Sequence, residues 1–133
     1  MKAIHVKSLS HTVKMIDLPK GVEHIYPYIG NGCTTFECPY IFATEDTIYV
    51  DEEGLFHETV GGFMIVNSKI NPLLGNALII GTDEEGGATD VKMTVEEVEK
   101  SIIWLTDEEC EIWREHALNT PPQLIVFPTE KDV

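Results

Sequence analysis

The first residues of the chain alternate between apolar and polar types, which is the pattern of a strand with two different faces. Residues 2–7, KAIHVK, place Ile4 and Val6 between lysines and a histidine. Residues 12–18, TVKMIDL, continue with Val13 and Met15 on one face. A period of two is typical of a half-buried strand, and the intervening SLSH favours a turn. We therefore expect the chain to open with a β-hairpin.

Four later segments predict further strands because they are rich in β-branched, aromatic or other apolar residues. Pro39 lies inside the first of them and indicates a sheet edge or a bulge, since proline cannot donate a ladder hydrogen bond. Before these segments, residues 21–26 predict a short helical stretch that Pro27 keeps from running long. The four segments are residues 33–43, 46–50, 61–66 and 76–81.

After residue 90 the pattern changes to a helical period. Thr94 with Glu97, and Thr106 with Glu109, have the spacing of a capping box, which marks two helix starts. Asn119 and the following prolines predict the end of the second helix. One apolar face on the first helix is predicted from Val95, Val98, Ile102 and Leu105, and one on the second from Cys110, Trp113 and Ala117.

Together these elements predict a single α+β domain over residues 1–133, built on a mostly antiparallel sheet. The core sheet is expected over about residues 1–90. Two short acidic helices follow near the C-terminus, over about residues 94–119, and a last strand is expected at residues 123–127, QLIVF.

Charge changes this picture more than composition does. The chain has 23 acidic residues, nine lysines and arginines, and a net charge of -14. Residues 1–40 are nearly neutral, with four lysines and three acids, whereas residues 41–133 hold 20 acids and five basic residues. The lack of a basic surface argues against direct binding to nucleic acid or to an anionic membrane. The charge suits solubility or an encounter with a basic partner.

The compartment is predicted from the apolar runs and the cysteines. No run approaches the roughly 20 residues that span a bilayer, and the first residues lack the apolar stretch of a signal peptide. Three cysteines, an odd number, are more consistent with free thiols in a reducing compartment. We therefore expect a cytoplasmic protein.

The tetrapeptide DEEG occurs twice, at residues 51–54 and 83–86, each time after an apolar run. Aspartate and glycine in these positions favour a turn. A second interpretation is a metal site for a metal-dependent hydrolase, and it requires Asp51, Asp83 and Asp90 to converge, because hard cations prefer carboxylate oxygens. We interpret both copies as turns and expect neither a bound metal nor another cofactor.

Two further groups of residues are candidate binding sites. Asn67, Asn71 and Asn76 favour turns, but they are also candidates for a neutral hydrogen-bonding rim that sequesters a nucleotide-type signal. Glu108, Glu111 and Glu115 lie on one helical stripe, and Trp104 falls off the apolar face predicted for its helix. Spaced acids beside an exposed aromatic could imitate a phosphate backbone and bind a basic groove.

Among catalytic signatures, neither a G-x-S-x-G elbow nor a phosphate-binding glycine loop is present, so we expect no catalytic residue.

Part of the chain is similar to the family called domain of unknown function 3846. The matching positions are Asp51, Glu53 and Gly54 in the first DEEG, Asn71, and GNALIIG at residues 75–81. The similar part covers about residues 45–90, and the opening MKAI strand over residues 1–6 also resembles that family. The resemblance implies a small accessory protein of a phage or mobile element. Combined with the acidic stripe, it leads us to expect a protein that binds and inhibits a host protein that has a basic surface, with host defence proteins among the candidate targets.

Overall fold

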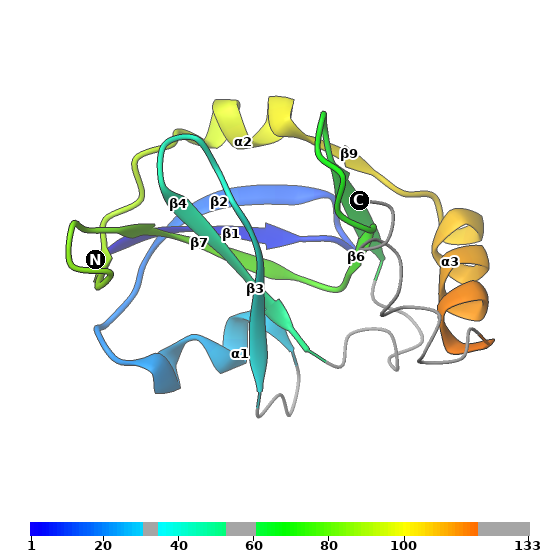
Figure 1. Ribbon diagram of the computed structural model, residues 1–133, viewed down its shortest axis with the longest axis horizontal. Helices are drawn as coiled ribbons and strands as arrows, with labels where there is room; N and C mark the ends of the chain where they lie inside the picture. The colour runs from blue at the N-terminus through cyan, green and yellow to red at the C-terminus, as the bar shows by residue number, and fades with distance from the viewer. Residues whose placement is uncertain (31–34, 53–60, 120–133) are drawn as a thin grey trace, which may run out of the picture.

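The computed structural model describes residues 1–30, 35–52 and 61–119. The expected strand at residues 123–127 lies outside the described residues, as do Glu53 and Gly54 of the first DEEG. The largest sheet is antiparallel, with the strand order β2-β1-β7-β4-β3, and β8 pairs with β7 (Figure 1). Its strands are β1 (Lys2–Lys7), β2 (Thr12–Asp17), β3 (Phe36–Ile41), β4 (Asp46–Asp51), β7 (Ala77–Thr82) and β8 (Ala88–Thr89).

A second, smaller sheet and one α-helix cover one face of the large sheet, and another α-helix extends beyond it (Figure 1). The small sheet has the order β6-β5-β9 and is also antiparallel. The opposite face of the large sheet is covered by two short helical segments, so the large sheet lies between layers (Figure 1). The remaining elements are η1 (Val22–His24), α1 (Tyr26–Ile29), β5 (Gly62–Ile65), β6 (Leu73–Leu74), α2 (Val95–Ser101), β9 (Ile102–Trp104) and α3 (Asp107–Asn119).

Strand alternation divides the core into two clusters. On β1, Ile4 and Val6 face the small sheet and α2, where they pack with Phe63 and Val98. Ala3 faces the other way, in the cluster that includes Ile25 and Ile29 at the two ends of α1. The central strand β7 is buried on both faces, as its continuous run of apolar residues predicts.

The sequence pattern is confirmed for the sheet and for the α+β class. The opening hairpin forms as expected, with β2 ending at Asp17, one residue before the expected end. Pro39 lies on β3, which is an edge strand, and the register shifts between Glu37 and Tyr40. The helical stretch near residues 21–26 is present as η1 and then α1, where Pro27 occupies the first turn because that turn does not need its N–H.

The helix predicted from Thr94 to Leu105 was wrong in its second half. The capping box of Thr94 and Glu97 is present, but α2 ends at Ser101 and the chain continues as the strand β9. There, Ile103 pairs with Met64 of β5. Two consecutive β-branched residues and an aromatic residue favour a strand, and pairing with β5 satisfies their backbone groups.

Helix α3 begins as predicted. The Thr106 hydroxyl accepts a hydrogen bond from the Glu109 N–H, and the Glu109 carboxylate accepts one from the Thr106 N–H. Cys110 is buried against Leu74 and Leu105, so α3 packs on the outer face of the small sheet. The sequence prediction missed Arg114, which lies on the same face and is buried.

A buried carboxylate on β4 binds the segment that connects β8 to α2. Asp46 is fully buried at the start of β4. Its oxygens accept hydrogen bonds from the Lys92 N–H at 2.9 Å, the Met93 N–H at 2.9 Å and the Thr44 hydroxyl at 2.7 Å. Hydrogen bonds from backbone N–H groups can replace the water that a buried carboxylate loses. Asp46 thus holds together segments that are distant in the sequence.

Candidate interaction surface

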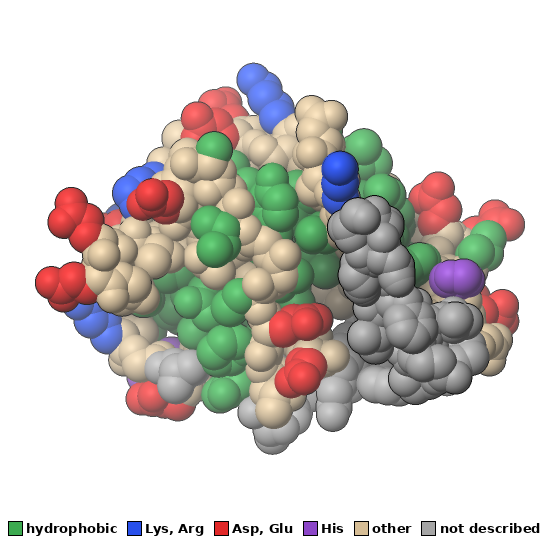
Figure 2. Space-filling model, in the orientation of Figure 1, with side chains coloured by type: hydrophobic (Ala, Val, Ile, Leu, Met, Phe, Trp, Pro, Cys, Tyr) green, Lys and Arg blue, Asp and Glu red, His purple; other side chains and the backbone are tan. Residues whose placement is uncertain are grey.

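The outward face of α3 combines acidic side chains with an exposed aliphatic one. Glu108, Ile112 and Glu115 are spaced by four and three residues, so they lie along one stripe. This stripe is opposite the face that carries Cys110 and Arg114. Ile112 is 60 % exposed, and both glutamates are exposed. Figure 2 shows acidic side chains spread over α3 at the right of the view, with hydrophobic side chains between them.

Glu111 has a different role from the other two glutamates of the predicted stripe. It is mostly exposed, and its carboxylate accepts a hydrogen bond from the buried Arg114 three residues later. An arginine that leaves water is stabilised by such a carboxylate. Glu111 therefore compensates the charge of the buried Arg114 on the packed face of α3, whereas Glu108 and Glu115 are exposed to solvent.

Trp104 does not lie beside this acidic stripe. On β9 it shares the inner face with Ile102, packs against the core and contacts Phe63 edge-to-face at a centroid distance of 6.2 Å. The ring of His11, from the β1–β2 turn, stacks on it at 4.7 Å and nearly parallel, with 6° between the planes. The next residue, Leu105, packs under α3. The geometry gives Trp104 a packing role and leaves Ile112 as the exposed apolar residue of the stripe.

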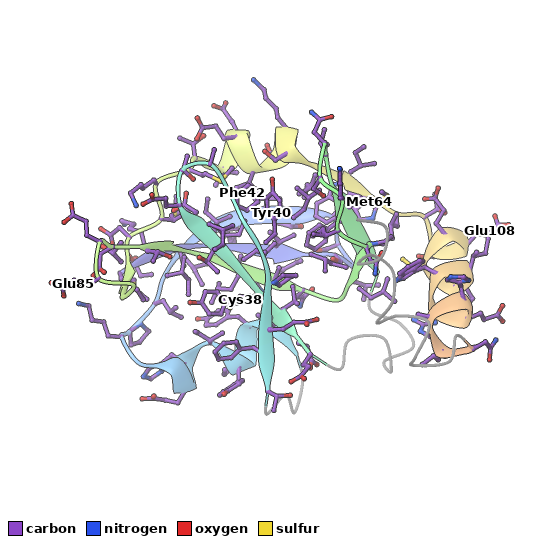
Figure 3. The ribbon with its side chains drawn as sticks, in the orientation of Figure 1. Cys38, Tyr40, Phe42, Met64, Glu85 and Glu108 are labelled. Carbon is purple, nitrogen blue, oxygen red and sulfur yellow. The ribbon has the colours of Figure 1, made fainter. Side chains whose placement is uncertain are left out.

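A second exposed apolar pair lies on the outer face of the small sheet. Met64 and Ile103 are cross-strand neighbours on β5 and β9 and are 39 % and 56 % exposed. Figure 3 shows Met64 on the small sheet and Glu108 at the outer end of the molecule, on α3. The sequence gives no signal for this pair, because residues 61–66, GGFMIV, are glycine or apolar throughout and do not distinguish the two faces of β5.

The three asparagines of the predicted rim do not share one rim. Asn67 follows β5 with a left-handed backbone (φ 62°), which asparagine tolerates better than most residues. Asn76 lies before β7, and its side-chain oxygen accepts a hydrogen bond from the Ser8 N–H at 3.1 Å. Because β5 and β6 are antiparallel, Asn67 and Asn76 lie toward opposite ends of the pair. Asn71 is exposed in the connection between them.

The aspartates of the alternative metal site are also separated. In the antiparallel pair of β4 and β7, Asp46 is opposite Gly81, so Asp51 and Asp83 lie at opposite ends. Asp83 forms the second DEEG turn, where its carboxylate accepts hydrogen bonds from the Glu85 and Gly87 N–H groups. The carboxylate of Asp90 accepts one from the Lys2 N–H. Within residues 1–30, 35–52 and 61–119, no three His, Cys, Asp or Glu side chains form a group that could hold a metal ion.

The surroundings of both described thiols raise their pKa above the ordinary value. Burial raises the pKa of the Cys38 thiol, and the negative charge of Glu37 adds to the rise. Burial also raises the pKa of Cys110, with Asp107 as the next contribution. A raised pKa leaves less of the reactive thiolate at neutral pH. Both cysteines are free thiols.

The comparisons with known proteins add no relative. No family model, no curated protein and no solved structure matches the chain. In the described part of the chain, no helix is both long and apolar enough to cross a membrane.

Proposed function

We propose that the protein is a non-catalytic binding protein that uses the outer stripe of α3 to cover a basic surface on another protein. The observation that carries this proposal is Ile112, an aliphatic side chain exposed between Glu108 and Glu115. A few residues buried at the centre of an interface supply most of the affinity, while charges around them steer the encounter and select the partner. An apolar anchor flanked by carboxylates suits a partner with an apolar pocket rimmed by lysines or arginines.

The acidic character of both C-terminal helices supports the same proposal. Acidic residues occupy the first turns of α2 and α3, and Glu115 extends the negative charge along α3. A cytoplasmic target that handles nucleic acid would present the complementary charge, and covering its basic groove would inhibit it. In the phage or mobile-element setting that the resemblance implies, the target is a host protein.

The test compares two variants of equal net charge. Glu108→Lys/Glu115→Lys reverses the charge of the α3 stripe, and the matched control Glu84→Lys/Glu85→Lys reverses two exposed glutamates in the β7–β8 turn. Figure 3 places Glu85 and Glu108 at opposite ends of the molecule. Tagged proteins are incubated with host extract at low and moderate salt, and retained proteins are identified by mass spectrometry.

We expect a basic protein that the wild type and the control variant retain, that the α3 variant loses, and that salt releases. Ile112→Asp should lose the same protein although the variant is more acidic, because the apolar anchor is gone. Loss in both charge variants would reduce the effect to net charge and contradict the proposal. Retention of nothing by the wild type would also contradict it.

A further inference from the structure

The large sheet has two edges of different character. At one edge, β3 carries Pro39 and a shift in register, which are features that keep an edge strand from pairing with another chain. At the other edge, β2 pairs with β1 over six residues with no shift, and it contains no proline. Within the described residues, β1 is the one strand that pairs with β2. The open side of β2 is therefore a regular pairing edge.

The backbone groups on this edge follow from the hydrogen-bond pattern of the hairpin. Met1 and Leu18 exchange both backbone hydrogen bonds, at 2.9 and 2.8 Å. In an antiparallel ladder such pairs alternate with pairs that do not bond to each other. In the register of β1 with β2, the N–H and C=O groups of Val13, Met15 and Asp17 therefore point away from β1.

We propose that two copies of this chain pair through β2, antiparallel and centred on Met15, to form one continuous sheet. In this register Met15 lies opposite Met15 of the second copy, and Val13 lies opposite Asp17. Each outward-facing residue then meets another outward-facing residue, so the edge groups of all three satisfy one another. Met15 is an exposed apolar residue on an edge strand, and pairing buries it on the two-fold axis.

The charges on β2 are compatible with this pairing and disfavour one alternative register. Each copy has a net charge of -14, but residues 1–40, which contain β2, hold four lysines and three acids. The strand β2 itself carries one basic residue, Lys14, and one acidic residue, Asp17, so two β2 strands meet without a net charge on either strand. A register centred on Lys14 would also align outward-facing groups, but it would place Lys14 directly opposite Lys14, and like charges in that position are destabilising. The Met15 register avoids that repulsion.

This association is independent of the proposed function and has the opposite dependence on salt. Salt screens the mutual repulsion of two acidic copies and should strengthen the dimer, whereas it should weaken the capture of a basic partner. The mass of the purified full chain is measured by light scattering coupled to size-exclusion chromatography, over a dilution series at low and moderate salt. The test variant is Met15→Lys, and the matched control is Met64→Lys, because both methionines are 39 % exposed.

We expect the wild type and Met64→Lys to have twice the monomer mass at high concentration, and Met15→Lys to remain monomeric with an unchanged circular dichroism spectrum. Amide hydrogen exchange supplies a second measurement. The N–H groups of Val13, Met15 and Asp17 should exchange more slowly as the protein concentration rises, and this protection should be lost in Met15→Lys. A wild type that is monomeric at every concentration, or a dimer that survives Met15→Lys, would overturn the proposal.

Discussion

The buried carboxylate of Asp46 gives the sharpest test of how this fold is held together. Asp46→Asn preserves the size of the side chain but removes the charge and replaces one acceptor oxygen with a donor. One of the two backbone N–H groups, of Lys92 or Met93, then loses its partner inside the protein. The substitution therefore isolates the hydrogen bonds from the packing.

The expected loss of unfolding free energy follows from the three hydrogen bonds that Asp46 accepts. A buried donor left without a partner costs about 1–3 kcal/mol, and replacing a charged acceptor with a neutral one weakens each remaining hydrogen bond by about 1 kcal/mol. These contributions add up to about 3–5 kcal/mol, so we expect Asp46→Asn to lower the free energy of unfolding by at least about 3 kcal/mol. Thr44→Ala removes one of the three donors and should cost about 1 kcal/mol.

The assay is urea unfolding followed by circular dichroism. With a slope of about 2 kcal/mol per molar urea for a chain of this size, Asp46→Asn should lower the midpoint by at least about 1.5 M. The matched control is Glu84→Gln, the same carboxylate-to-amide change at an exposed turn residue, and its midpoint should stay unchanged. A midpoint for Asp46→Asn within about 0.3 M of the wild type, at unchanged slope, would refute this account of Asp46.

Three further predictions concern close approach, capping and thiol chemistry. Gly81→Ala should lower the unfolding free energy by about 1–3 kcal/mol in the same assay, because its Cβ would collide with the Asp90 carbonyl oxygen; an unchanged midpoint would contradict this. Thr106→Ala should cost about 1 kcal/mol through the lost cap of α3, and Thr106→Ser should restore most of it. Cys38 in the variant Glu37→Gln should react faster with iodoacetamide at pH 8 than in the wild type, because removing the carboxylate lowers the pKa of the thiol. Mass spectrometry of the labelled peptide measures the rate. An equal rate in both proteins would argue against this coupling.

The sequence determined the local features, because their causes are short-range. The alternation over residues 2–7 and 12–18 gives the hairpin, and the spacing of Thr106 and Glu109 gives the start of α3. Pro39 identified an edge strand because a missing N–H excludes a central position. The second DEEG is a turn because aspartate and glycine favour that backbone wherever they stand.

The tertiary structure decided whatever depended on a distant partner. Residues 102–104 fit a helical face as well as a strand, and only pairing with β5 selects the strand. The sequence does not distinguish Asp46 from other polar residues at the start of a strand, because its hydrogen-bond donors come from the distant segment before α2. The candidate surface followed the same rule: the spacing placed Glu108 and Glu115 on one stripe, but packing against the small sheet decided that Ile112, rather than Trp104, is the exposed apolar residue beside them. Periodicity fixes which side chains share a face, and only the neighbouring elements fix which face is buried.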